Sequence, residues 1–444
     1  MNVGAGAFDA EMIAAHLPPL RLRDGRQLSD AEQAVLAIPD GARVYVGGGA
    51  APPLALLEAM VSQRHHWTHL ELVMPMLQQR LPVFEHAGEP FHFVSLQASP
   101  AFKYLWGNPA LRVLPTRYGD YARLCAADGP LPCDAALVTV CPPEQGRVSL
   151  GLAVGSVVVP ARTTPLVLGQ INAEMPYTLG AGELPVLHFD ALVEGADAPR
   201  ASRGGNEVDP AAGAIAALAA ALISDGSTIQ FGVGSIPNDI LARLIGHKGL
   251  RVHSGLVSEA CMLLHQAGVI EGPMIAGEVV GSPGMRAWIH RNPAVLMAPP
   301  SVTHGAATLA GIEQFVAINS AVEVALDGSA NLEMVGSEII SGPGGAPDFA
   351  FGASISNGGR HLTALKSAAA GGSISRIVPH IEPPHPVTLP AYLADHVLTE
   401  CGQADVRALS GSDRGLALAG IAHPDHRAAL ERAAAGSPGQ ETPG

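Results

Sequence analysis

The chain has little positive charge, few aromatic residues and no long apolar segment. Its 444 residues carry a formal net charge of −14, and the lysines are confined to Lys103, Lys248 and Lys366. Nucleic acid is therefore excluded as the main partner, because binding to phosphates needs a basic surface. A bound anion has to be held by backbone N–H groups, by helix N-termini or by arginines.

Membrane and export signals are also lacking. The most apolar run, residues 215–223, is too short to cross a bilayer. The N-terminus has no basic region followed by an apolar run, so no signal peptide is indicated. The cysteines are odd in number and widely spaced, and no two of them form a Cys-x-x-Cys pair. They are Cys125, Cys133, Cys141, Cys261 and Cys401. We expect buried free thiols in a reducing cytoplasm and no membrane partner.

Two stretches 185 residues apart read as copies of one unit. Residues 40–56 and 225–241 share an aspartate, glycines, a proline and a leucine at the same offsets. Each copy predicts a turn, a β-rich strand, a glycine turn, a proline in the first helical turn and an apolar helix. The repeat implies two related halves by duplication, with the glycine turns at the carboxyl ends of strands, where open sheets place ligands.

The rest of the chain alternates strands and helices. Strands are predicted where β-branched residues lie between glycines or prolines, at residues 43–46, 70–74, 92–94, 135–140, 166–171, 227–231, 294–298, 314–318, 323–325, 361–364 and 396–399. An alanine-rich helix is predicted at residues 210–224, after a connector around residues 195–210.

These patterns predict an α/β protein made of two related open domains. Hydrophobic residues make up 48% of the chain and charged residues 15%, which indicates a globular protein with a sizeable core. We expect mainly parallel sheets with helices on both faces. The predicted domains are residues 1–200 and 201–432, followed by a disordered tail at residues 433–444, which is rich in Ala, Gly, Ser and Pro.

Two glycine-containing segments are candidates for chemistry. The Gln230 amide and the backbone N–H of Gly232 can converge on one oxygen, as an oxyanion site requires. The alternative is a surface glutamine before a packing turn. In the segment 341–349, Gly342, Gly344 and Gly345 allow backbone N–H groups to approach a phosphate or a pantetheine amide, although a simple wide turn explains them too.

Other motifs exclude several enzyme classes. No Gly-Lys-Ser/Thr follows the glycine loop, and neither repeated turn has the third glycine of a dinucleotide-binding fingerprint. The cluster His65-His66-x-x-His69 has no evident acidic second shell, so we predict no metal. No His-Glu-x-x-His or Gly-x-Ser-x-Gly motif occurs. Three polar segments are weak signals individually: residues 371–379, 399–400 and 421–427.

Taken together, the motifs resemble the acetyl-CoA hydrolase/transferase family, which includes acetate and 4-hydroxybutyrate CoA-transferases. The resemblance covers about residues 30–430. In the first half it rests on Pro132-x-Asp134, Pro142-Pro143, Ser149-Leu150-Gly151 and Asn172-x-x-Met175-Pro176. In the second half it rests on Gln230-Phe-Gly232-Val-Gly234, Asn319-Ser320-Ala321, Gly342-Pro-Gly344-Gly345-Ala-Pro-Asp348, Gly372-x-x-x-Arg376 and Ile421-Ala-His423-Pro424-Asp425.

The resemblance implies a ping-pong reaction on acyl-CoA with coenzyme A as substrate, a small carboxylate as the second substrate and no permanent cofactor. A glutamate attacks the thioester, forms an acyl-glutamyl anhydride and passes through a glutamyl-CoA thioester. Gln230 and Gly232 match the family's oxyanion positions. The residues implied to line the CoA site are Gly234, Asn319, Gly342, Gly344, Gly345, Asp348 and Lys366. A homodimer is the family expectation.

One departure from the family falls on the nucleophile. The family glutamate follows a His-Ser or His-Thr pair, but here His253-Ser254 is followed by Gly255. A glycine has no side chain with which to attack a thioester. Further departures are Lys366 and Ala391, where the family has a proline and an arginine, and Cys401 after Glu400, where it has a tyrosine. The site is therefore expected to be remodelled.

Three hypotheses follow from this departure. The favoured one is acyl-CoA hydrolysis or related thioester chemistry without the glutamate. Glu278 stands at a position that is usually apolar in the family, and if buried it would have a raised pKa and serve as a base or replacement nucleophile; an exposed glutamate at a strand end is the alternative. The second hypothesis is CoA transfer through another carboxylate such as Glu278. The third is a non-catalytic protein that binds CoA or an enzyme partner.

Overall fold

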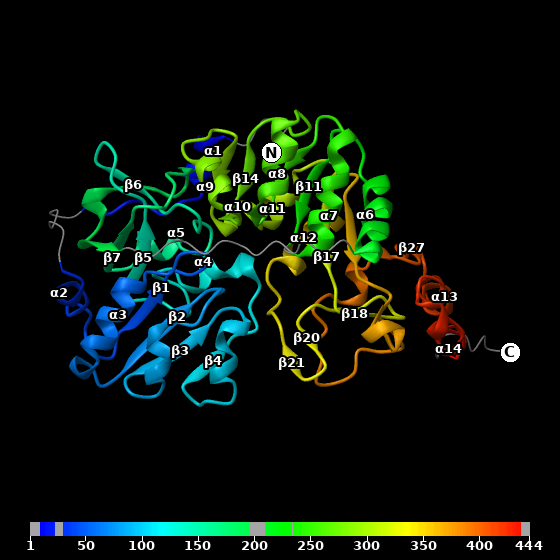
Figure 1. Ribbon diagram of the computed structural model, residues 1–444, viewed down its shortest axis with the longest axis horizontal. Helices are drawn as coiled ribbons and strands as arrows, with labels where there is room; N and C mark the ends of the chain where they lie inside the picture. The colour runs from blue at the N-terminus through cyan, green and yellow to red at the C-terminus, as the bar shows by residue number, and fades with distance from the viewer. Residues whose placement is uncertain (1–8, 23–29, 196–208, 233, 437–444) are drawn as a thin grey trace.

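Two β-sheets organise the chain. The computed structural model describes residues 9–22, 30–195, 209–232 and 234–436. Figure 1 shows the sheets side by side, the first in blue to green and the second in green to orange. Across these described ranges, no helix has both the length and the apolar character needed to span a bilayer. All five cysteines are free thiols; four are buried and Cys401 is half-buried.

The first sheet has seven parallel strands in the order β10-β7-β5-β1-β2-β3-β4. Their bounds are β1 (Arg43–Val46), β2 (Leu70–Met74), β3 (Phe91–Ser95), β4 (Leu111–Val113), β5 (Ala135–Val140), β7 (Leu166–Asn172) and β10 (Ala191–Gly195). Strand β5 is buried along its whole length, as expected for a parallel strand covered on both faces.

The second sheet has six strands in the order β12-β11-β17-β22-β26-β27, all parallel except the final antiparallel pair. Their bounds are β11 (Thr228–Phe231), β12 (Arg251–Val252), β17 (Phe315–Ser320), β22 (Arg360–Ala364), β26 (His396–Thr399) and β27 (Gly402–Asp405). Each strand predicted from the sequence is present, with ends that agree within two residues.

The strand orders confirm that the halves are related. The series β2-β1-β5-β7-β10 in the first sheet corresponds to β12-β11-β17-β22-β26 in the second. In the first sheet, β1 has β2 on one side and β5, β7 and β10, in chain order, on the other. In the second sheet, β11 has β12 on one side and β17, β22 and β26, in chain order, on the other. The repeated stretches are the units β1–α3 (Leu54–Ser62) and β11–α7 (Ser235–Arg243). Pro237 lies in the first turn of α7 as predicted, whereas its counterpart Pro52 in the first copy precedes Pro53, the N-cap of α3, and so lies outside the helix.

Helices pack around both sheets (Figure 1). Besides α3 and α7 they are α1 (Ala10–Ala15), α2 (Ala31–Val35), α4 (Tyr121–Leu124), α5 (Val158–Thr163), α6 (Pro210–Leu222), α8 (Glu259–Gln266), α9 (Pro283–Ile289), α10 (Pro300–Thr303), α11 (Ala306–Ala310), α12 (Ala346–Ile355), α13 (Gly411–Gly420) and α14 (Pro424–Ala435). The predicted tail overlaps the end of α14, which runs to Ala435; residues 437–444 lie outside the described residues.

The two halves are joined by a continuous seam. Strand β8 (Leu179–Gly180) of the first half pairs with β16 (Val295–Met297), which pairs with β14 (Met274–Ala276). Backbone bridges also join Ala153 to Glu278 and Arg117 to Gly344. One hydrophobic core continues through both halves, containing for example Val154 and Ile275. The remaining short strands are β6 (Arg147–Ser149), β9 (Glu183–Pro185), β13 (Leu256–Val257), β15 (Glu278–Val279), β18 (Glu323–Ala325), β19 (Ala330–Asn331), β20 (Met334–Val335), β21 (Glu338–Ile339), β23 (Ala368–Ala369), β24 (Ile374–Ser375) and β25 (Ile377–Val378).

Candidate active site between the two halves

Glu278 lies at the seam, directly beside Gly255, the position where the sequence predicts that the family glutamate is replaced. Strand β15 pairs with β13 so that Glu278 stands opposite Leu256, and the Glu278 N–H donates to the Gly255 carbonyl oxygen at 3.0 Å. Its side chain reaches across to the first half. There Oε1 accepts hydrogen bonds from the Tyr118 hydroxyl at 2.7 Å and from the Ser156 hydroxyl at 2.9 Å, with the Ser156 N–H at 3.3 Å.

The two carboxylate oxygens of Glu278 have different surroundings. Oε1 is anchored by three donors, whereas Oε2 has no hydrogen-bond donor among the described residues. Oε2 lies 3.4 Å from the place that a Cβ atom would take at Gly49, in the glycine turn after β1. One oxygen is thus held in place and the other faces the carboxyl end of the first repeated strand.

Burial raises the pKa of Glu278 to about 7, although the hydrogen bonds from Tyr118 and Ser156 act to lower it. The side chain is half-buried, so it is not the exposed strand-end glutamate of the alternative reading. A carboxyl group that titrates near neutral pH is suited to proton transfer, and its ionised form is a stronger nucleophile than an ordinary carboxylate.

Two facing glycines give Tyr118 access to Glu278. A Cβ atom at Gly155 would lie 2.6 Å from the Tyr118 hydroxyl oxygen and 2.9 Å from the Gly277 Cα atom. A Cβ atom at Gly277 would lie 3.2 Å from the Gly155 Cα atom. The missing side chains therefore let the two backbones approach closely enough for the Tyr118–Glu278 hydrogen bond to form.

His304 occupies the space beside Gly255. A Cβ atom at Gly255 would lie 3.2 Å from both Cε1 and Nε2 of the His304 ring, which would have to shift to admit a side chain. The buried imidazole is packed against the Tyr118 and Phe349 rings, with centroid distances of 4.6 and 4.3 Å. Burial lowers the pKa of His304 to about 3, with a smaller contribution from His253, so the ring is neutral.

The sequence reasoning identified Glu278 but missed Tyr118, Ser156 and His304. Tyr118 and Glu278 are 160 positions apart, and Ser156 and Glu278 are 122 apart. No spacing rule connects residues so distant in the chain. The one feature of the sequence that could have indicated them is the set of glycines Gly155, Gly255 and Gly277. Because these residues lack a side chain, they leave room for the Tyr118 and His304 side chains.

The predicted oxyanion pair is not assembled as expected. The N–H of Gly232 donates to the Ile318 carbonyl oxygen at 3.1 Å, continuing the parallel ladder between β11 and β17, so it is not directed at a ligand. The buried Gln230 accepts from Asn319 Nδ2 at 3.4 Å, and the same nitrogen lies 3.3 Å from His361 Nε2. Gln230 and Asn319 therefore share a polar chain within the sheet.

The glycine-rich loop packs against protein. A Cβ atom would lie 3.1 Å from the Ala98 backbone nitrogen if added at Gly342, 3.3 Å from Gln97 Nε2 at Gly344, and 2.4 Å from His304 Nε2 at Gly345. The contacts at Gly342 and Gly344 explain these glycines as positions where the second half closes on the first, and Gly345 allows a close approach to His304 within the second half. They provide no separate indication of a phosphate.

Asp348, another predicted CoA ligand, also joins the halves. Its buried carboxylate accepts from the Gly119 N–H at 3.0 Å and forms an ion pair with Arg117 Nη1 at 3.0 Å. Burial raises the pKa of Asp348 to about 6 against the opposing effects of the Gly119 hydrogen bond and Arg117. The carboxylate is thus engaged with the protein at the seam.

A cavity of about 620 Å³ lies at the carboxyl ends of β17, β22 and β26. Its walls bring together the three weak polar segments noted in the sequence, through Gly371, Gly372, Arg376, Glu400 and His423. Lys366 and, from α7, Ile236 also line it, and Gly234 is the N-cap of that helix. Lys366 Nζ pairs with Asp209 at 2.5 Å, and Glu400 accepts from the Ser367 N–H and hydroxyl.

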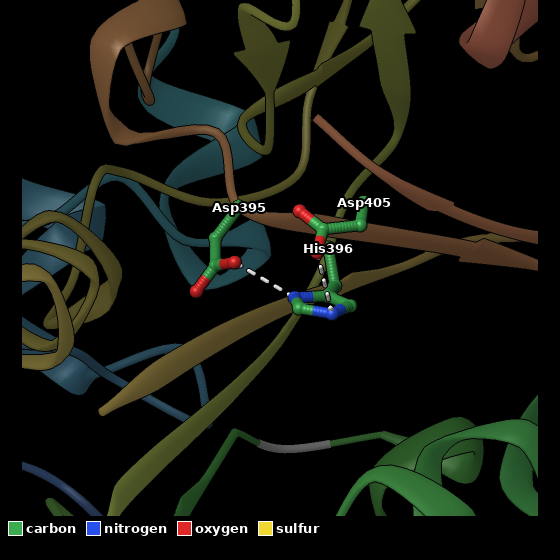
Figure 2. A group of neighbouring side chains, drawn as sticks. All are labelled: Asp395, His396 and Asp405. Atoms are coloured by element: carbon green, nitrogen blue, oxygen red, sulfur yellow. Dashed lines mark hydrogen bonds and ion pairs between the residues drawn. The ribbon is translucent and has the colours of Figure 1, made fainter. Parts of the chain in front are cut away.

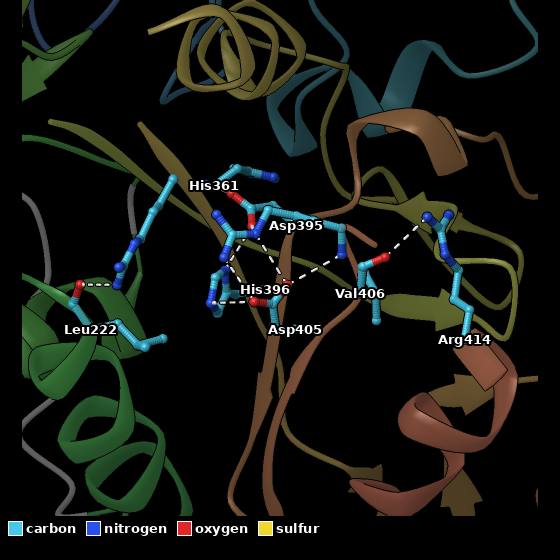
Figure 3. A network of polar contacts seen from close by, with 9 residues as sticks. Leu222, His361, Asp395, His396, Asp405, Val406 and Arg414 are labelled. Atoms are coloured by element: carbon cyan, nitrogen blue, oxygen red, sulfur yellow. Dashed lines mark hydrogen bonds and ion pairs between the residues drawn. The ribbon is translucent and has the colours of Figure 1, made fainter. Parts of the chain in front are cut away.

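One group of possible metal ligands occurs among the described residues, at the edge formed by β26 and β27. Asp395, His396 and Asp405 bring ligand atoms within 4.8 Å of one another (Figure 2). Arg407 pairs with Asp395 at 2.9 Å and with Asp405 at 2.8 Å, so a guanidinium already neutralises these carboxylates. Figure 3 shows the wider network, in which Asp395 also accepts from the His361 N–H. This arrangement is a structural ion-pair network.

Comparisons with known proteins agree with the fold and the motifs. The acetyl-CoA hydrolase/transferase C-terminal domain model matches residues 281–434. The 4-hydroxybutyrate coenzyme A transferase of Clostridium kluyveri is 30% identical over 420 residues, which are 91% of this chain and 96% of that protein. RipA from Yersinia pestis superimposes with a TM-score of 0.86 at 26% identity, covering 92% of this chain and 97% of RipA. A 4-hydroxybutyrate CoA-transferase from Porphyromonas gingivalis gives a TM-score of 0.75 at 26% identity, over 92% and 96% of the two chains.

Proposed function

Because the chain belongs to the acetyl-CoA hydrolase/transferase family and is thus an enzyme acting on CoA thioesters, we propose that it is a carboxylate CoA-transferase in which Glu278 replaces the glutamate absent at Gly255. The observation that carries this proposal is the state of the Glu278 carboxylate. One oxygen is anchored by Tyr118 and Ser156, and the other faces a glycine turn without a donor. An anchored carboxylate with one open oxygen is preorganised for attack.

The reaction balances with Glu278 as the only covalent residue. Oε2 attacks the thioester carbon, the C–S bond breaks, and CoA leaves as its thiolate while an acyl-glutamyl anhydride forms. The thiolate then attacks the Glu278 carbonyl carbon, which releases the first carboxylate and leaves a glutamyl-CoA thioester. The second carboxylate repeats both steps in reverse, and no proton is consumed.

We place the CoA chain in the cavity beside β17, β22 and β26. The carboxyl ends of parallel strands lie along one edge of a sheet, where open α/β sheets bind ligands. Gly255 follows β12 at that same edge, and β12 and β22 are three strand spacings apart, which is about 15 Å. The pantetheine arm is the part of CoA that would cross this distance. Lys366, Arg376 and His423 supply positive or polar groups for phosphates.

Replacing Lys366 with Gln is expected to weaken CoA binding about fivefold at low ionic strength, because one partly exposed charge contributes on the order of 1 kcal/mol. Calorimetric titration with free CoA measures this change. The loss should shrink as salt is raised, since the interaction is screened. Lys248, the matched control, donates through its backbone to Asp225 away from the cavity, and Lys248→Gln should leave binding unchanged.

The pH dependence of turnover should report Glu278. Only the ionised carboxylate can attack, so kcat/KM for acyl-CoA is expected to rise with pH around an apparent pKa of about 7. Initial rates of acyl exchange across this range measure it. A profile that rises around the ordinary carboxyl pKa would contradict the assigned nucleophile.

The same pKa has a consequence for stability. Since the folded-state pKa of Glu278 is raised from 4.5 to about 7, the folded state binds more protons than the unfolded state between these values. Stability contributed by this group is therefore lost as pH rises through that window. The Glu278→Gln variant should gain thermal stability relative to the wild type above neutral pH and less below it.

Hydrolysis is the second candidate, favoured by the pKa of Glu278 near neutrality, which also suits a general base acting on water. One experiment separates the two functions. Acetyl-CoA and butyryl-CoA are incubated with and without carbon-13-labelled acetate, and free CoA and labelled acetyl-CoA are followed by mass spectrometry. Label exchange and reduction of Glu278 to an alcohol by borohydride indicate transfer. Free CoA without acetate, and no label exchange, indicates hydrolysis.

A further inference from the structure

A transfer through Glu278 leaves an oxyanion that needs a hydrogen-bond donor. The Gly232 N–H is used by the ladder to Ile318, and the Tyr118 hydroxyl donates to Glu278 itself. Neither group is therefore available to the thioester oxygen. The nearest polar atom to a Cβ atom placed at Gly255 is His304 Nε2, at 3.2 Å, and the same nitrogen would lie 2.4 Å from a Cβ atom at Gly345.

The hydrogen bonds of Thr303 determine which nitrogen of His304 carries the proton. The Pro299 carbonyl oxygen already accepts from the N–H groups of Val302 at 2.9 Å and Thr303 at 3.0 Å, which uses both of its lone pairs. The Thr303 hydroxyl lies at a longer 3.3 Å from that oxygen but at 2.7 Å from His304 Nδ1. We assign the hydroxyl as the donor to Nδ1, the shorter of its two contacts, which leaves the proton on Nε2 as a donor.

The His304 ring is also fixed in direction and charge. It is packed between Tyr118 and Phe349, and no described residue accepts a hydrogen bond from its Nε2. The neutral imidazole keeps one N–H donor across the working pH range. A neutral imidazole N–H can polarise a carbonyl without losing its proton.

We infer that His304 is a catalytic residue whose Nε2–H donates a hydrogen bond to the acyl oxygen of the CoA thioester, from the space that the family glutamate would fill. This inference rests on the proposed function. When Oε2 of Glu278 attacks the carbonyl carbon, the C=O electron pair moves to oxygen, and the Nε2–H bond stabilises that oxyanion. The electron pair returns as the C–S bond breaks and thiolate leaves, so His304 neither gains nor loses a proton.

The kinetic test compares three variants. His304→Phe keeps a ring between Tyr118 and Phe349 but removes the donor, and kcat is expected to fall about 10²- to 10³-fold with little change in KM. His304→Gln restores an N–H donor and should recover part of the loss. The pH profile should remain that of Glu278 in all of them. The matched control is His247→Phe, since the His247 ring bonds the Ile223 carbonyl away from the seam, and it should keep full activity.

A spectroscopic test is independent of turnover. The probe is a ketone analogue of butyryl-CoA in which a methylene replaces the sulfur, labelled with carbon-13 at the carbonyl. Its carbonyl stretch in the infrared should shift to lower frequency on binding to the wild type and to His247→Phe. The shift should be absent in His304→Phe. If that variant does not fold, His304→Ala, which only removes atoms, is measured in the same way.

The outcomes separate this inference from the proposed function. If Glu278→Gln abolishes turnover but the infrared shift is the same with and without His304, the inference is wrong and the proposed function stands. If Glu278→Gln stays active while the shift still requires His304, the proposed function is wrong and the donor role stands. A wild-type protein that does not bind the analogue overturns both.

Discussion

The Glu278→Gln variant is expected to lose acyl exchange by about 10⁴-fold or more, since an amide cannot attack a thioester. The amide oxygen can still accept from Tyr118 and Ser156 as the Glu278 Oε1 atom does, so the seam should stay closed and the protein folded. Exchange of labelled acetate into acetyl-CoA measures turnover, and thermal unfolding checks the fold. Glu278→Asp keeps the carboxylate on a shorter side chain and should retain more activity than the amide variant.

A matched control distinguishes loss of the nucleophile from loss of any buried charge. Glu71 pairs with Arg43 at 2.5 Å and with Arg112, and its pKa is lowered rather than raised. Glu71→Gln should leave kcat unchanged because Glu71 stands opposite Arg43 at the amino end of β1, whereas Glu278 faces Gly49 beyond the carboxyl end of that strand. Wild-type exchange rates in Glu278→Gln would show that another group attacks and would remove Glu278 from the mechanism.

The Gly155→Ala variant is expected to lose both stability and activity. The added Cβ atom would lie 2.9 Å from the Gly277 Cα atom, which is backbone and cannot rotate away. Overpacking of this kind costs about 1–3 kcal/mol of unfolding free energy. The same atom would lie 2.6 Å from the Tyr118 hydroxyl oxygen, so the anchor of Glu278 should be displaced. A misplacement of that size typically lowers kcat about 10²-fold.

Chemical denaturation and acyl exchange measure the two effects of Gly155→Ala separately. The control is Gly420→Ala, because a Cβ atom at Gly420 in α13 would have no neighbour within 4 Å. This control should be neutral or slightly stabilising, as alanine restricts the unfolded chain more than glycine does. A Gly155→Ala protein with wild-type stability and wild-type kcat would show that the seam is looser than the contact at Gly277 indicates.

Local patterns in the sequence were enough to predict the architecture. The strand at residues 43–46 and its copy at residues 227–231 are short β-rich runs between an Asp-Gly turn and a glycine turn, and both are strands β1 and β11. Such signals work because turn geometry and strand propensity depend on neighbours in the chain. The related strand orders of the two sheets then follow from duplication of one unit.

The sequence also predicted departures from the family motifs at Gly255 and at Glu278. Their relation was not readable. The hydrogen bond from the Glu278 N–H to the Gly255 oxygen depends on β13 pairing with β15, and strands of two residues carry too little pattern to fix a register.

Local runs of residues were enough to establish the two-half α/β fold and the family, and to predict that Gly255 stands where the family has a glutamate. What occupies the space beside Gly255 depends on packing in three dimensions. Docking of the halves brings Tyr118 and Ser156 onto Glu278. Packing within the second half sets His304 beside Gly255, and the pairing of β11 with β17 commits the Gly232 N–H to Ile318. These contacts join segments far apart in the chain, and shape complementarity between packed surfaces, which no periodicity records, selects them.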